Sequence, residues 1–480
     1  MESSVQTQDG KASLFRTSLD NRPNQAFFAR EGVDPLTHAF DKKIAVHAGF
    51  GGRPLPKPEQ GPELDRLLAQ TRHERSAVYI HVPFCESHCL YCGFYSRAYR
   101  DGESGRFTDA LLREIDLWRE RPAVQEGPVH AVYIGGGTPT TLEPEDMYRL
   151  LVRVQEAFPL ANDCEITVEG RIHNFGADKM AACLDGGANR FSIGVQTFHT
   201  ELRRSMGRLA DRESVIQSLA GLSGFDRAVV VIDLIYGFPG QTADIWCKDI
   251  ETFLSLDIDG ADFYQLNVFG NSLLKKALEA GKFPPPADLP GQARMFAVGE
   301  RMMERARYRR LSMSHWGRTT RERNIYNHLM KGPSECLAFG PGAGGCLGGH
   351  YYFVNNDYKS WHSSIDAGEK PISILVGPRP LAQIDKTLAA AFDLGRLDLD
   401  RLGASLPSAA FNETSFDEAR MREMPKEILR PLLEQWRRAG LLEIEDGWVE
   451  LTTAGRFWHV NLAQLAIDYL HRWFEKEEIK

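Results

Sequence analysis

Residues 79–94 read Tyr-Ile-His-Val-Pro-Phe-Cys-Glu-Ser-His-Cys-Leu-Tyr-Cys-Gly-Phe, and they decide how the rest of the chain is interpreted. Their apolar start predicts a short strand, which leads into Cys85, Cys89 and Cys92 in the spacing Cys-x3-Cys-x2-Cys. Soft sulfur ligands select zinc, Cu(I) or iron–sulfur clusters. A structural zinc ion takes four protein ligands, and His88 inside the loop could be the fourth. A 4Fe–4S cluster normally takes four cysteines, so three would leave one iron open to a small chelating molecule.

Length and composition indicate a large soluble protein. The chain has 480 residues, of which 42% are hydrophobic, so two or three domains with a sizeable core are expected. No apolar run approaches the roughly 20 residues that cross a bilayer. Residues 1–10 are polar and lack the basic-then-apolar pattern of a secretory signal, which predicts a cytoplasmic protein.

The other cysteines and the net charge argue against two classes of protein. Eight cysteines in a chain of this length do not indicate a disulfide scaffold. Those outside the loop are scattered, and we interpret them as small buried hydrophobic residues: Cys164, Cys183, Cys247, Cys336 and Cys346. The net charge of −8 does not indicate nucleic-acid binding, which relies on cationic contacts with phosphate.

Strand-like and helix-like stretches alternate through the middle of the chain. The six predicted strands are Ala77–His81, Val129–Ile134, Glu165–Glu169, Arg190–Val195, Ala228–Leu234 and Gly260–Leu266. The predicted helices between them are Phe107–Arg119, Glu143–Phe158, Ala177–Gly186, Thr200–Gly207, Ala210–Gly221 and Thr242–Leu256. Such alternation is typical of βαβ units and a parallel sheet. Six strands are too few for an eight-stranded barrel, so we expect an α/β fold with an open, partial parallel β/α barrel. Its site should lie at the carboxyl ends of the strands, where the cysteine loop falls.

Three domains are predicted. Residues 1–75 form an N-terminal arm, which is punctuated by glycine and proline and ends in a helix over Gly61–Arg75. Residues 76–375 form the core with its extension, and residues 376–480 form a small winged-helix-like α+β domain. That domain contains a helix over Ile428–Ala439, two strands joined by an Asp-Gly turn, and a helix over Thr453–Leu470.

The cysteine loop, with the aromatic Tyr91 before its third cysteine, resembles the cluster loop of the radical S-adenosylmethionine (SAM) superfamily. The resemblance implies a 4Fe–4S cluster held by Cys85, Cys89 and Cys92. In that superfamily the open iron binds the amino and carboxylate groups of SAM. Reduction of the cluster then cleaves SAM to methionine and a 5′-deoxyadenosyl radical.

Four further stretches are similar to the superfamily branch that includes oxygen-independent coproporphyrinogen III oxidase. They are Gly135–Thr140, Glu165–Glu169, Asn189–Phe198 followed by Gly207-Arg208, and Val231–Thr242. Consecutive glycines let a backbone approach a ligand closely, and a carboxylate at the end of a buried strand needs a partner. The resemblance implies SAM contacts from Tyr79, Tyr91, Gly93, Gly136, Gly137, Thr138, Glu169, Gln196, Arg208, Asp233 and Gly270. Among these, Gln196 and Arg208 occupy positions that lie near a second SAM in relatives.

One stretch departs from this branch. After the position of Glu169, relatives continue with a small residue, then Asn or Asp, then Pro, whereas this chain continues Gly170-Arg171-Ile172-His173. The departure places an arginine and a histidine near the reaction centre. It argues against a direct transfer of the coproporphyrinogen oxidase activity.

The arm separates members of the branch. Residues 34–41 (Asp-Pro-Leu-Thr-His-Ala-Phe-Asp) and 47–52 (His-Ala-Gly-Phe-Gly-Gly) resemble the anaerobic haem-degrading radical SAM methyltransferases, or anaerobilin synthases. This resemblance implies an enzyme that uses SAM, one or two molecules, as radical source and carbon donor. Such an enzyme alkylates the porphyrin of haem, opens the ring and releases iron. It takes electrons from a reductase or a flavodoxin-like partner, and neither membrane insertion nor nucleic-acid binding is expected.

Three alternatives remain open. The chain could be a coproporphyrinogen III oxidase, a chaperone that holds haem unchanged, or, from its winged-helix-like end, a nucleic-acid-binding protein. Haem iron is often held by histidine, and the candidates are His38, His47, His173 and His315. A lone histidine is more often a satisfied polar group, so none of them is assigned to the site.

Overall fold

The structure is a computed structural model, and it describes residues 24–49, 51–270, 272–379, 381–405 and 418–478. The described residues form two compact units. The core unit comprises Lys57–Met330 and Ser334–Leu375. The second unit comprises the described residues up to Pro56, Lys331–Pro333, and those from Val376 onward.

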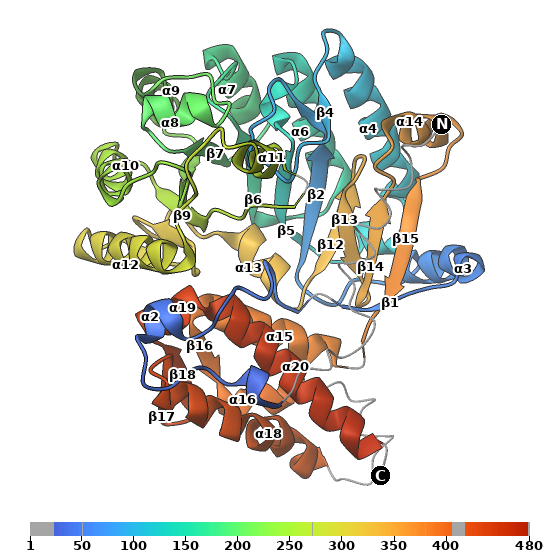
Figure 1. Cartoon of the computed structure of the whole chain (residues 1–480). Helices are drawn as coiled ribbons and strands as arrows, with labels where there is room; N and C mark the ends of the chain where they lie inside the picture. Colours follow the sequence, from blue (N-terminus) through green and yellow to red (C-terminus); the bar gives the residue numbers. More distant parts are fainter. Residues whose placement is uncertain (1–23, 50, 271, 380, 406–417, 479–480) are drawn as a thin grey trace. The chain divides into compact units, whose positions relative to one another are not determined.

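A curved sheet forms the centre of the core unit (Figure 1). The six predicted strands are confirmed as adjacent parallel strands: β2 (Ser76–Val82), β5 (Val129–Gly136), β6 (Leu160–Gly170), β7 (Arg190–Gln196), β8 (Val229–Tyr236) and β9 (Gly260–Gln265). Their apolar, β-branched runs are largely buried, as expected for parallel strands. A further parallel strand, β12 (Glu335–Phe339), lies beside β2 and was not predicted from the sequence.

Antiparallel strands extend the sheet on both sides. They are β13 (Gly344–Leu347), β14 (His350–Val354) and β15 (Ile372–Gly377) beyond β12, and β11 (His315–Gly317) and β10 (Arg309–Arg310) beyond β9. The strand order begins and ends with different strands, so the prediction of an open, partial barrel is confirmed. A separate parallel pair, β3 (Phe84–Cys85) and β4 (Arg97–Ala98), contains the first cysteine of the loop.

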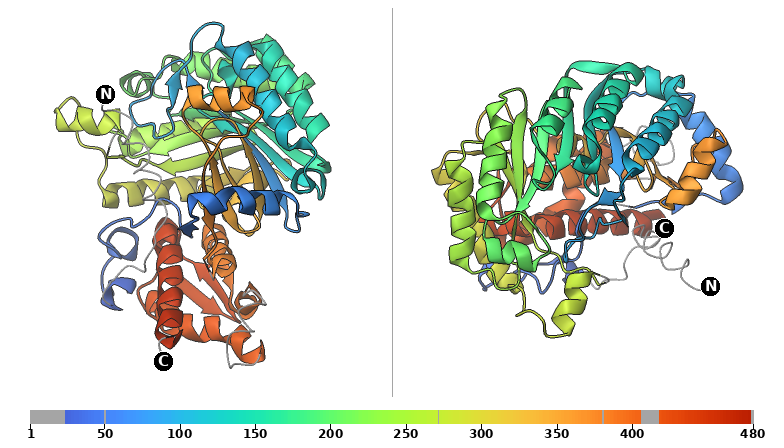
Figure 2. Two further views of the ribbon diagram at one scale, coloured as in Figure 1. Left: turned by 90° about the vertical axis from the view of Figure 1, so that its right-hand side faces the viewer. Right: turned by 90° about the horizontal axis from the view of Figure 1, so that it is seen from above.

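Helices follow the strands and form an arc outside the sheet (Figure 2). In chain order they are α3 (Lys57–Leu68), α4 (Glu103–Arg119), α5 (Pro122–Gln125), η2 (Pro139–Thr141), α6 (Pro144–Ala157), α7 (Ala177–Asp185), α8 (Thr200–Ser205), α9 (Arg212–Gly224), α10 (Ala243–Ser255), α11 (Leu273–Glu279), α12 (Leu289–Arg305), α13 (Ile325–Lys331) and α14 (Tyr358–Asp366). The six helices predicted between the strands are all present. The helix predicted over Gly61–Arg75 begins earlier and ends at Leu68, the last residue of its buried stripe.

A buried carboxylate fixes the glycine-rich turn after β12. Glu114 of α4 is fully buried and accepts hydrogen bonds from the Gly340 N–H (2.8 Å), Trp361 Nε1 (3.0 Å) and Lys370 Nζ (2.7 Å). Gly340 has φ of +89°, and a Cβ there would lie 2.3 Å from the carbonyl oxygen of His81. Only glycine therefore suits this turn, which packs against the end of β2.

The second unit joins the arm to the C-terminal module. The arm contributes η1 (Asn24–Phe27), α2 (Pro35–His38) and β1 (Arg53–Pro54). The module contributes α15 (Ala382–Leu394), β16 (Arg396–Asp398), α16 (Leu399–Leu402), η3 (Gly403–Ser405), α18 (Glu418–Arg438), β17 (Leu442–Glu445), β18 (Trp448–Leu451), α19 (Thr453–Phe457) and α20 (His459–Glu478). The predicted Asp-Gly turn joins β17 and β18, and both of its residues, Asp446 and Gly447, have positive φ. The small C-terminal sheet also includes β16, which was not predicted.

Buried amides attach the arm to the module. Asn461 on α20 is fully buried, accepts a hydrogen bond from the Ile44 N–H (3.1 Å) and donates one to the Lys42 carbonyl (2.9 Å). Gln435 on α18 bonds in the same two-sided way to the backbone of Ala29. The arm up to Pro56 therefore belongs to the compact unit of the module, whereas the rest of the predicted 1–75 segment from Lys57 belongs to the core unit.

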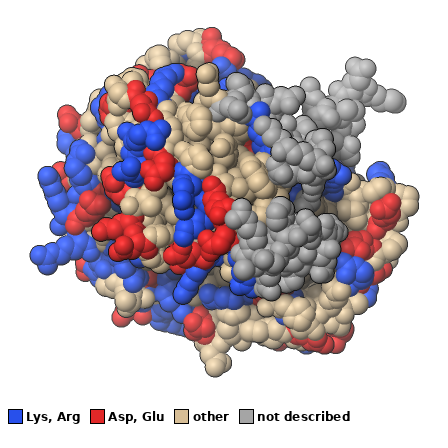
Figure 3. Space-filling model, turned by 90° about the horizontal axis from the view of Figure 1, so that it is seen from below, with Lys and Arg blue, Asp and Glu red and all other residues tan. Residues whose placement is uncertain are grey.

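The surface and the helices bear on two of the expected absences. Figure 3 shows acidic and basic side chains intermixed on the face that it presents, where no extended basic patch is visible. In the part of the chain that the structure describes, no helix is both long and apolar enough to cross a membrane.

Candidate active site at the cysteine loop

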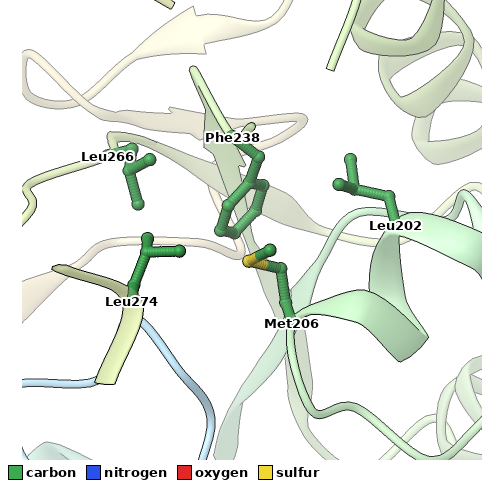
Figure 4. Close-up of a cluster of buried hydrophobic side chains, with 5 residues drawn as sticks. All are labelled: Leu202, Met206, Phe238, Leu266 and Leu274. Atoms are coloured by element: carbon green, nitrogen blue, oxygen red, sulfur yellow. The ribbon is translucent and has the colours of Figure 1, made fainter. Parts of the chain in front are cut away.

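The cysteine loop lies at the carboxyl end of β2, between β2 and α4. Its centre is held from both sides, since the Leu90 N–H donates to the Met206 carbonyl (3.2 Å) and the Leu90 carbonyl accepts from the Leu274 N–H (2.8 Å). These contacts lie beside the apolar cluster in Figure 4, which contains Leu202, Met206, Phe238, Leu266 and Leu274. Tyr91 packs edge-on against Phe238 of that cluster, with ring centroids 5.1 Å apart. The core thus holds the loop in position at the end of the strands.

The three cysteine thiols have different neighbours. Cys85 accepts a hydrogen bond from Thr138 Oγ1 (3.4 Å), and Cys92 accepts one from the Phe94 N–H (3.3 Å). Cys89 lies between two guanidinium groups, with Arg171 Nη2 at 3.1 Å and Arg208 Nη1 at 3.7 Å. Burial raises the pKa of the Cys85 and Cys92 thiols. Burial would also raise the pKa of Cys89, but the charges of Arg208 and Arg171 outweigh it and lower that pKa.

This donor set fits a 4Fe–4S cluster. Three thiols come from one loop, and cations beside Cys89 can offset the negative charge of thiolates. Among the described residues no three His, Cys, Asp or Glu side chains already converge as a metal-binding group. The ring of His88, the side chain that the zinc alternative needs, stacks on Tyr95 with centroids 3.9 Å apart.

The glycine loop after β5 approaches the cysteine loop closely. The Gly137 N–H donates to the Val82 carbonyl (2.8 Å), and a Cβ on Gly137 would lie 2.4 Å from the Phe84 carbonyl oxygen. Gly136 has φ of +114°, and a Cβ there would lie 2.9 Å from the Val82 carbonyl oxygen. Neither position can hold a side chain, because the backbone at the end of β2 and the start of the cysteine loop lies against it.

Two predicted carboxylates lie on β6 and β8, the strands on either side of β7. Glu169 accepts a hydrogen bond from the Gly136 N–H (3.2 Å), and Asp233 lies 3.4 Å from Ser192 Oγ. Burial, followed by the charge of Asp233, raises the pKa of Glu169 to about 8. Burial, followed by the charge of Asp262, raises the pKa of Asp233 to about 7. Neither carboxylate has a cation within ion-pair distance among the described residues, so both can accept a cationic or hydroxyl-bearing ligand.

Three other residues predicted to contact SAM, Tyr79, Gln196 and Gly270, lie in different surroundings. Tyr79 stacks on Tyr133 and Tyr326 inside the sheet, with its hydroxyl 3.0 Å from His81 Nδ1. Gln196 has φ of +73°, and within the described chain its buried Oε1 has no hydrogen-bond partner. Gly270 lies in a turn where a Cβ would meet no atom within 4 Å, so the structure does not pack it against the other candidates.

Gly93 and two arginines complete the surroundings of the loop. A Cβ on Gly93 would lie 3.0 Å from the ring of Phe269. Arg171 and Arg203 both line a cavity of about 20 Å³ beside the cysteine loop, together with Arg208. Arg203 was not predicted as a site residue from the sequence, where its nearness to Arg208, five residues on, was the one feature that pointed to it. Arg171 departs from the family pattern in the sequence, but it was not predicted to contact the loop cysteines.

The four histidine candidates do not form a common site. His315 is fully buried, with Nδ1 2.7 Å from Asp262 and Nε2 3.2 Å from Glu322. It therefore belongs to an ion-pair network rather than to a free ligand position. His38 lies 2.6 Å from its neighbour Thr37 Oγ1, and His47 is exposed on the arm. His173 lines the cavity beside the loop and is 3.7 Å from Glu86.

Three comparisons with known proteins bear on the family. Residues 79–253 match the model of the radical SAM superfamily. The chain is 39% identical over 450 residues to anaerobilin synthase from Escherichia coli O157:H7, which covers 93% of this chain and 95% of that protein. It is 29% identical over 277 residues to the haem chaperone HemW of Bacillus subtilis (strain 168), which covers 57% of this chain and 71% of that protein.

A solved structure agrees with the fold. Coproporphyrinogen III oxidase (HemN) from Escherichia coli superposes with a TM-score of 0.70 at 20% sequence identity, covering 89% of this chain and 96% of that chain. At this identity the likeness shows a shared fold alone. The match to anaerobilin synthase is closer and spans nearly both chains, so this chain belongs to the radical SAM superfamily and, within it, to the family of anaerobilin synthase.

Proposed function

We propose that this protein degrades haem without oxygen, using SAM as radical source and carbon donor to alkylate the porphyrin, open the ring and release iron. One observation carries the proposal: the 39% identity to anaerobilin synthase extends over 93% of the chain and so includes core, arm and C-terminal module. The match to a haem chaperone of the same branch covers only 57% of the chain.

A radical SAM protein uses a 4Fe–4S cluster and SAM. In this chain Cys85, Cys89 and Cys92 would hold the cluster, which supplies an electron for the cleavage of SAM when both are bound. The protein's own contribution is to bind, orient and shield the reactants. The close approach of Gly136 and Gly137 to the cysteine loop offers backbone groups for the amino end of SAM.

Charge supports this placement of SAM. Among the described residues, Glu169 and Asp233 have no cation within ion-pair distance, and they lie at strand positions that suit an ammonium group or ribose hydroxyls. Within the same residues Arg208 has no carboxylate at that distance, and it contacts Cys89 and the Gly194 carbonyl. A ligand with both signs, such as SAM, satisfies these carboxylates and this arginine together. Gln196, whose Oε1 has no partner in the described chain, suits a second SAM or the edge of the first.

The proposal also includes the substrate, the electron donor and the cellular location. The substrate is haem or a related tetrapyrrole, and a flavodoxin or reductase supplies the electrons. The protein acts in the cytoplasm. The arm is part of the proposal as well, because its residues 34–41 and 47–52 carry the resemblance to the haem-degrading group.

The decisive experiment is anaerobic turnover of the cluster-reconstituted protein with SAM, a reductant and haem, analysed by mass spectrometry. We expect 5′-deoxyadenosine and an iron-free, ring-opened tetrapyrrole that carries an added carbon. Intact haem bound in stoichiometric amount, without that product, would instead favour a chaperone. Decarboxylated product from coproporphyrinogen III would favour the oxidase.

A pair of cysteine variants controls this assay. Cys92→Ala removes one of the three loop thiols, so we expect loss of the cluster absorption band and of both products. Cys247→Ala removes a thiol on α10, outside the loop, and should retain both. Equal behaviour of the two variants would contradict the assignment of the loop as the cluster site.

A further inference from the structure

The surroundings of the three loop cysteines are asymmetric in charge. Cys85 receives a hydroxyl hydrogen bond from Thr138, and Cys92 receives a backbone N–H from Phe94. Among the described contacts of the three thiols, those of Cys89 include two with guanidinium groups, Arg171 at 3.1 Å and Arg208 at 3.7 Å. One corner of the loop is therefore strongly cationic.

The arginines around this corner lack acidic partners among the described residues. Arg171 uses Nη1 for the carbonyl and hydroxyl oxygens of Ser87, at 3.0 and 3.1 Å. Arg203 donates to the backbone carbonyls of Val195, Thr197 and Ala210. Arg208 donates to the carbonyl of Gly194. Each group is held in place by neutral oxygens, and no carboxylate of the described residues lies within ion-pair distance of it.

One acidic residue lines the same cavity, but it is directed elsewhere. Glu86 contacts the Asn174 side-chain amide, and its Oε2 lies 3.7 Å from His173 Nε2. Arg203 and Arg208 are only 2% and 7% exposed. Burying cations without counter-charge is costly, so a structure that retains them indicates that an anion belongs beside them.

A cluster held by three thiolates is that anion. It carries net negative charge, and reduction adds one more negative charge to it. Hydrogen bonds and cations at the ligating sulfurs stabilise the reduced form and raise the reduction potential.

We propose that Arg171 is a positioning residue that donates to the sulfur of Cys89 and raises the reduction potential of the cluster. The proposal uses the departure from the family pattern, since Arg171 stands where relatives carry Asn or Asp. Ser87 holds the guanidinium group in place, so its charge acts on Cys89 rather than on solvent. The inference rests on the cysteine loop as the cluster site and does not depend on haem being the substrate.

The test is an anaerobic potentiometric titration of the reconstituted full-length protein, without SAM or haem, followed by electron paramagnetic resonance of the reduced cluster. For Arg171→Gln we expect about a tenfold fall in the equilibrium constant for reduction, or about 59 mV for a one-electron couple. Arg171→Lys keeps the charge but loses the paired contacts with Ser87 and Cys89, so we expect a smaller fall of about threefold.

Arg204→Gln is the matched control. Arg204 lies on α8 next to Arg203, is 57% exposed and pairs with Glu201 at 3.3 Å, so its removal should leave the potential unchanged. An unchanged potential in Arg171→Gln with full iron content would overturn the proposal. If that variant also bound SAM more weakly in a separate titration, the result would assign Arg171 to the SAM carboxylate instead. If Arg171→Gln does not retain iron, Arg171→Lys decides, and a wild-type potential in that variant overturns the proposal.

Discussion

Two regions of the core unit differ in how their buried charges are satisfied. Around the cysteine loop, Arg171, Arg203 and Arg208 donate to sulfur and to neutral oxygens, without an acidic partner in the described chain. Deeper in the sheet, acidic and basic groups pair directly. Arg190 at the start of β7 lies 3.1 Å from Glu322 and 4.0 Å from Glu165.

The deeper network consists of direct ion pairs between buried residues. Burial would lower the pKa of His315, but Asp262 and Glu322 outweigh it and raise that pKa to about 9, so the imidazole is charged at neutral pH. Glu165 also accepts the N–H groups of Ile325 and Tyr326, at 2.8 and 3.0 Å. All of these charges have partners within the protein, which indicates a structural role.

Buried charged groups in this protein therefore fall into two classes, those of the fold and those of the candidate site. A buried charge with a protein partner stabilises the fold, whereas a buried charge without one indicates a missing ligand. By this criterion Glu169 and Asp233 belong with the arginines of the loop, although they are carboxylates, because Gly136 N–H and Ser192 Oγ are neutral donors.

The largest effect is expected for Arg190→Leu, which breaks the deeper network. Glu322 and Glu165 would lose their shared cation while buried, so we expect a loss of about 3–5 kcal/mol in the free energy of unfolding. The measurement is urea unfolding followed by circular dichroism. Arg227→Leu is the control, since Arg227 pairs with Asp185 at 2.7 Å on the surface and should cost about 0–1 kcal/mol. Equal losses in the two variants would remove the distinction between the regions.

A smaller effect is expected for the pH dependence of SAM binding. With a pKa of about 7, Asp233 keeps its proton in the folded protein at acid pH, and only the ionised form attracts a cationic ligand. SAM affinity should therefore rise with pH up to about 7, by at most roughly tenfold per unit. Without ligand the sign is opposite: a raised carboxyl pKa means that folding stability falls as pH rises from about 4 to about 7.

Isothermal titration of the reconstituted protein with SAM checks this prediction. Asp233→Asn should bind more weakly and lose the part of the pH dependence near pH 7, whereas the part that Glu169 contributes, with its pKa of about 8, should remain. Asp244→Asn, which alters an exposed carboxylate in the first turn of α10, should behave like the wild type. A pH profile in Asp233→Asn that is unchanged from the wild type would assign the titration to another group, such as Glu169, and return Asp233 to the structural class.

The features that depend on local sequence pattern could be predicted from the sequence. The six parallel strands follow from short apolar runs between helical stretches, and Cys85 to Cys92 are close in the chain, so their spacing alone places them together. β12 was missed because Glu335–Phe339 is short and adjoins a glycine-rich run. The attachment of the arm to the module was missed because it joins residues more than 400 positions apart, such as Ala29 and Gln435.

Charge pairing could not be predicted for the same reason. His315 and Asp262 are separated by 53 positions, and Arg190 and Glu322 by 132. In the sequence, therefore, His315 was a haem-ligand candidate on the same footing as His173. The structure separates them because only the former has a carboxylate at each ring nitrogen, and the latter faces the cavity beside the cysteine loop.

The smallest effect is expected for His88→Phe, which tests whether His88 binds the metal together with the three cysteines of the loop. The His88 ring lies parallel to Tyr95 and makes a stacking contact that phenylalanine can reproduce. We expect unchanged iron content after reconstitution and SAM cleavage within about twofold of the wild type, since a substitution that only replaces stacking changes little free energy. Metal analysis by mass spectrometry and 5′-deoxyadenosine formation measure both. A zinc loop that used His88 as its fourth ligand would instead lose its metal in this variant, and it would bind zinc rather than iron in the wild type. Retention of iron by His88→Phe together with its loss in Cys92→Ala would restrict the ligand set to the three thiols, which is the condition for an open iron beside Arg171 and Arg208.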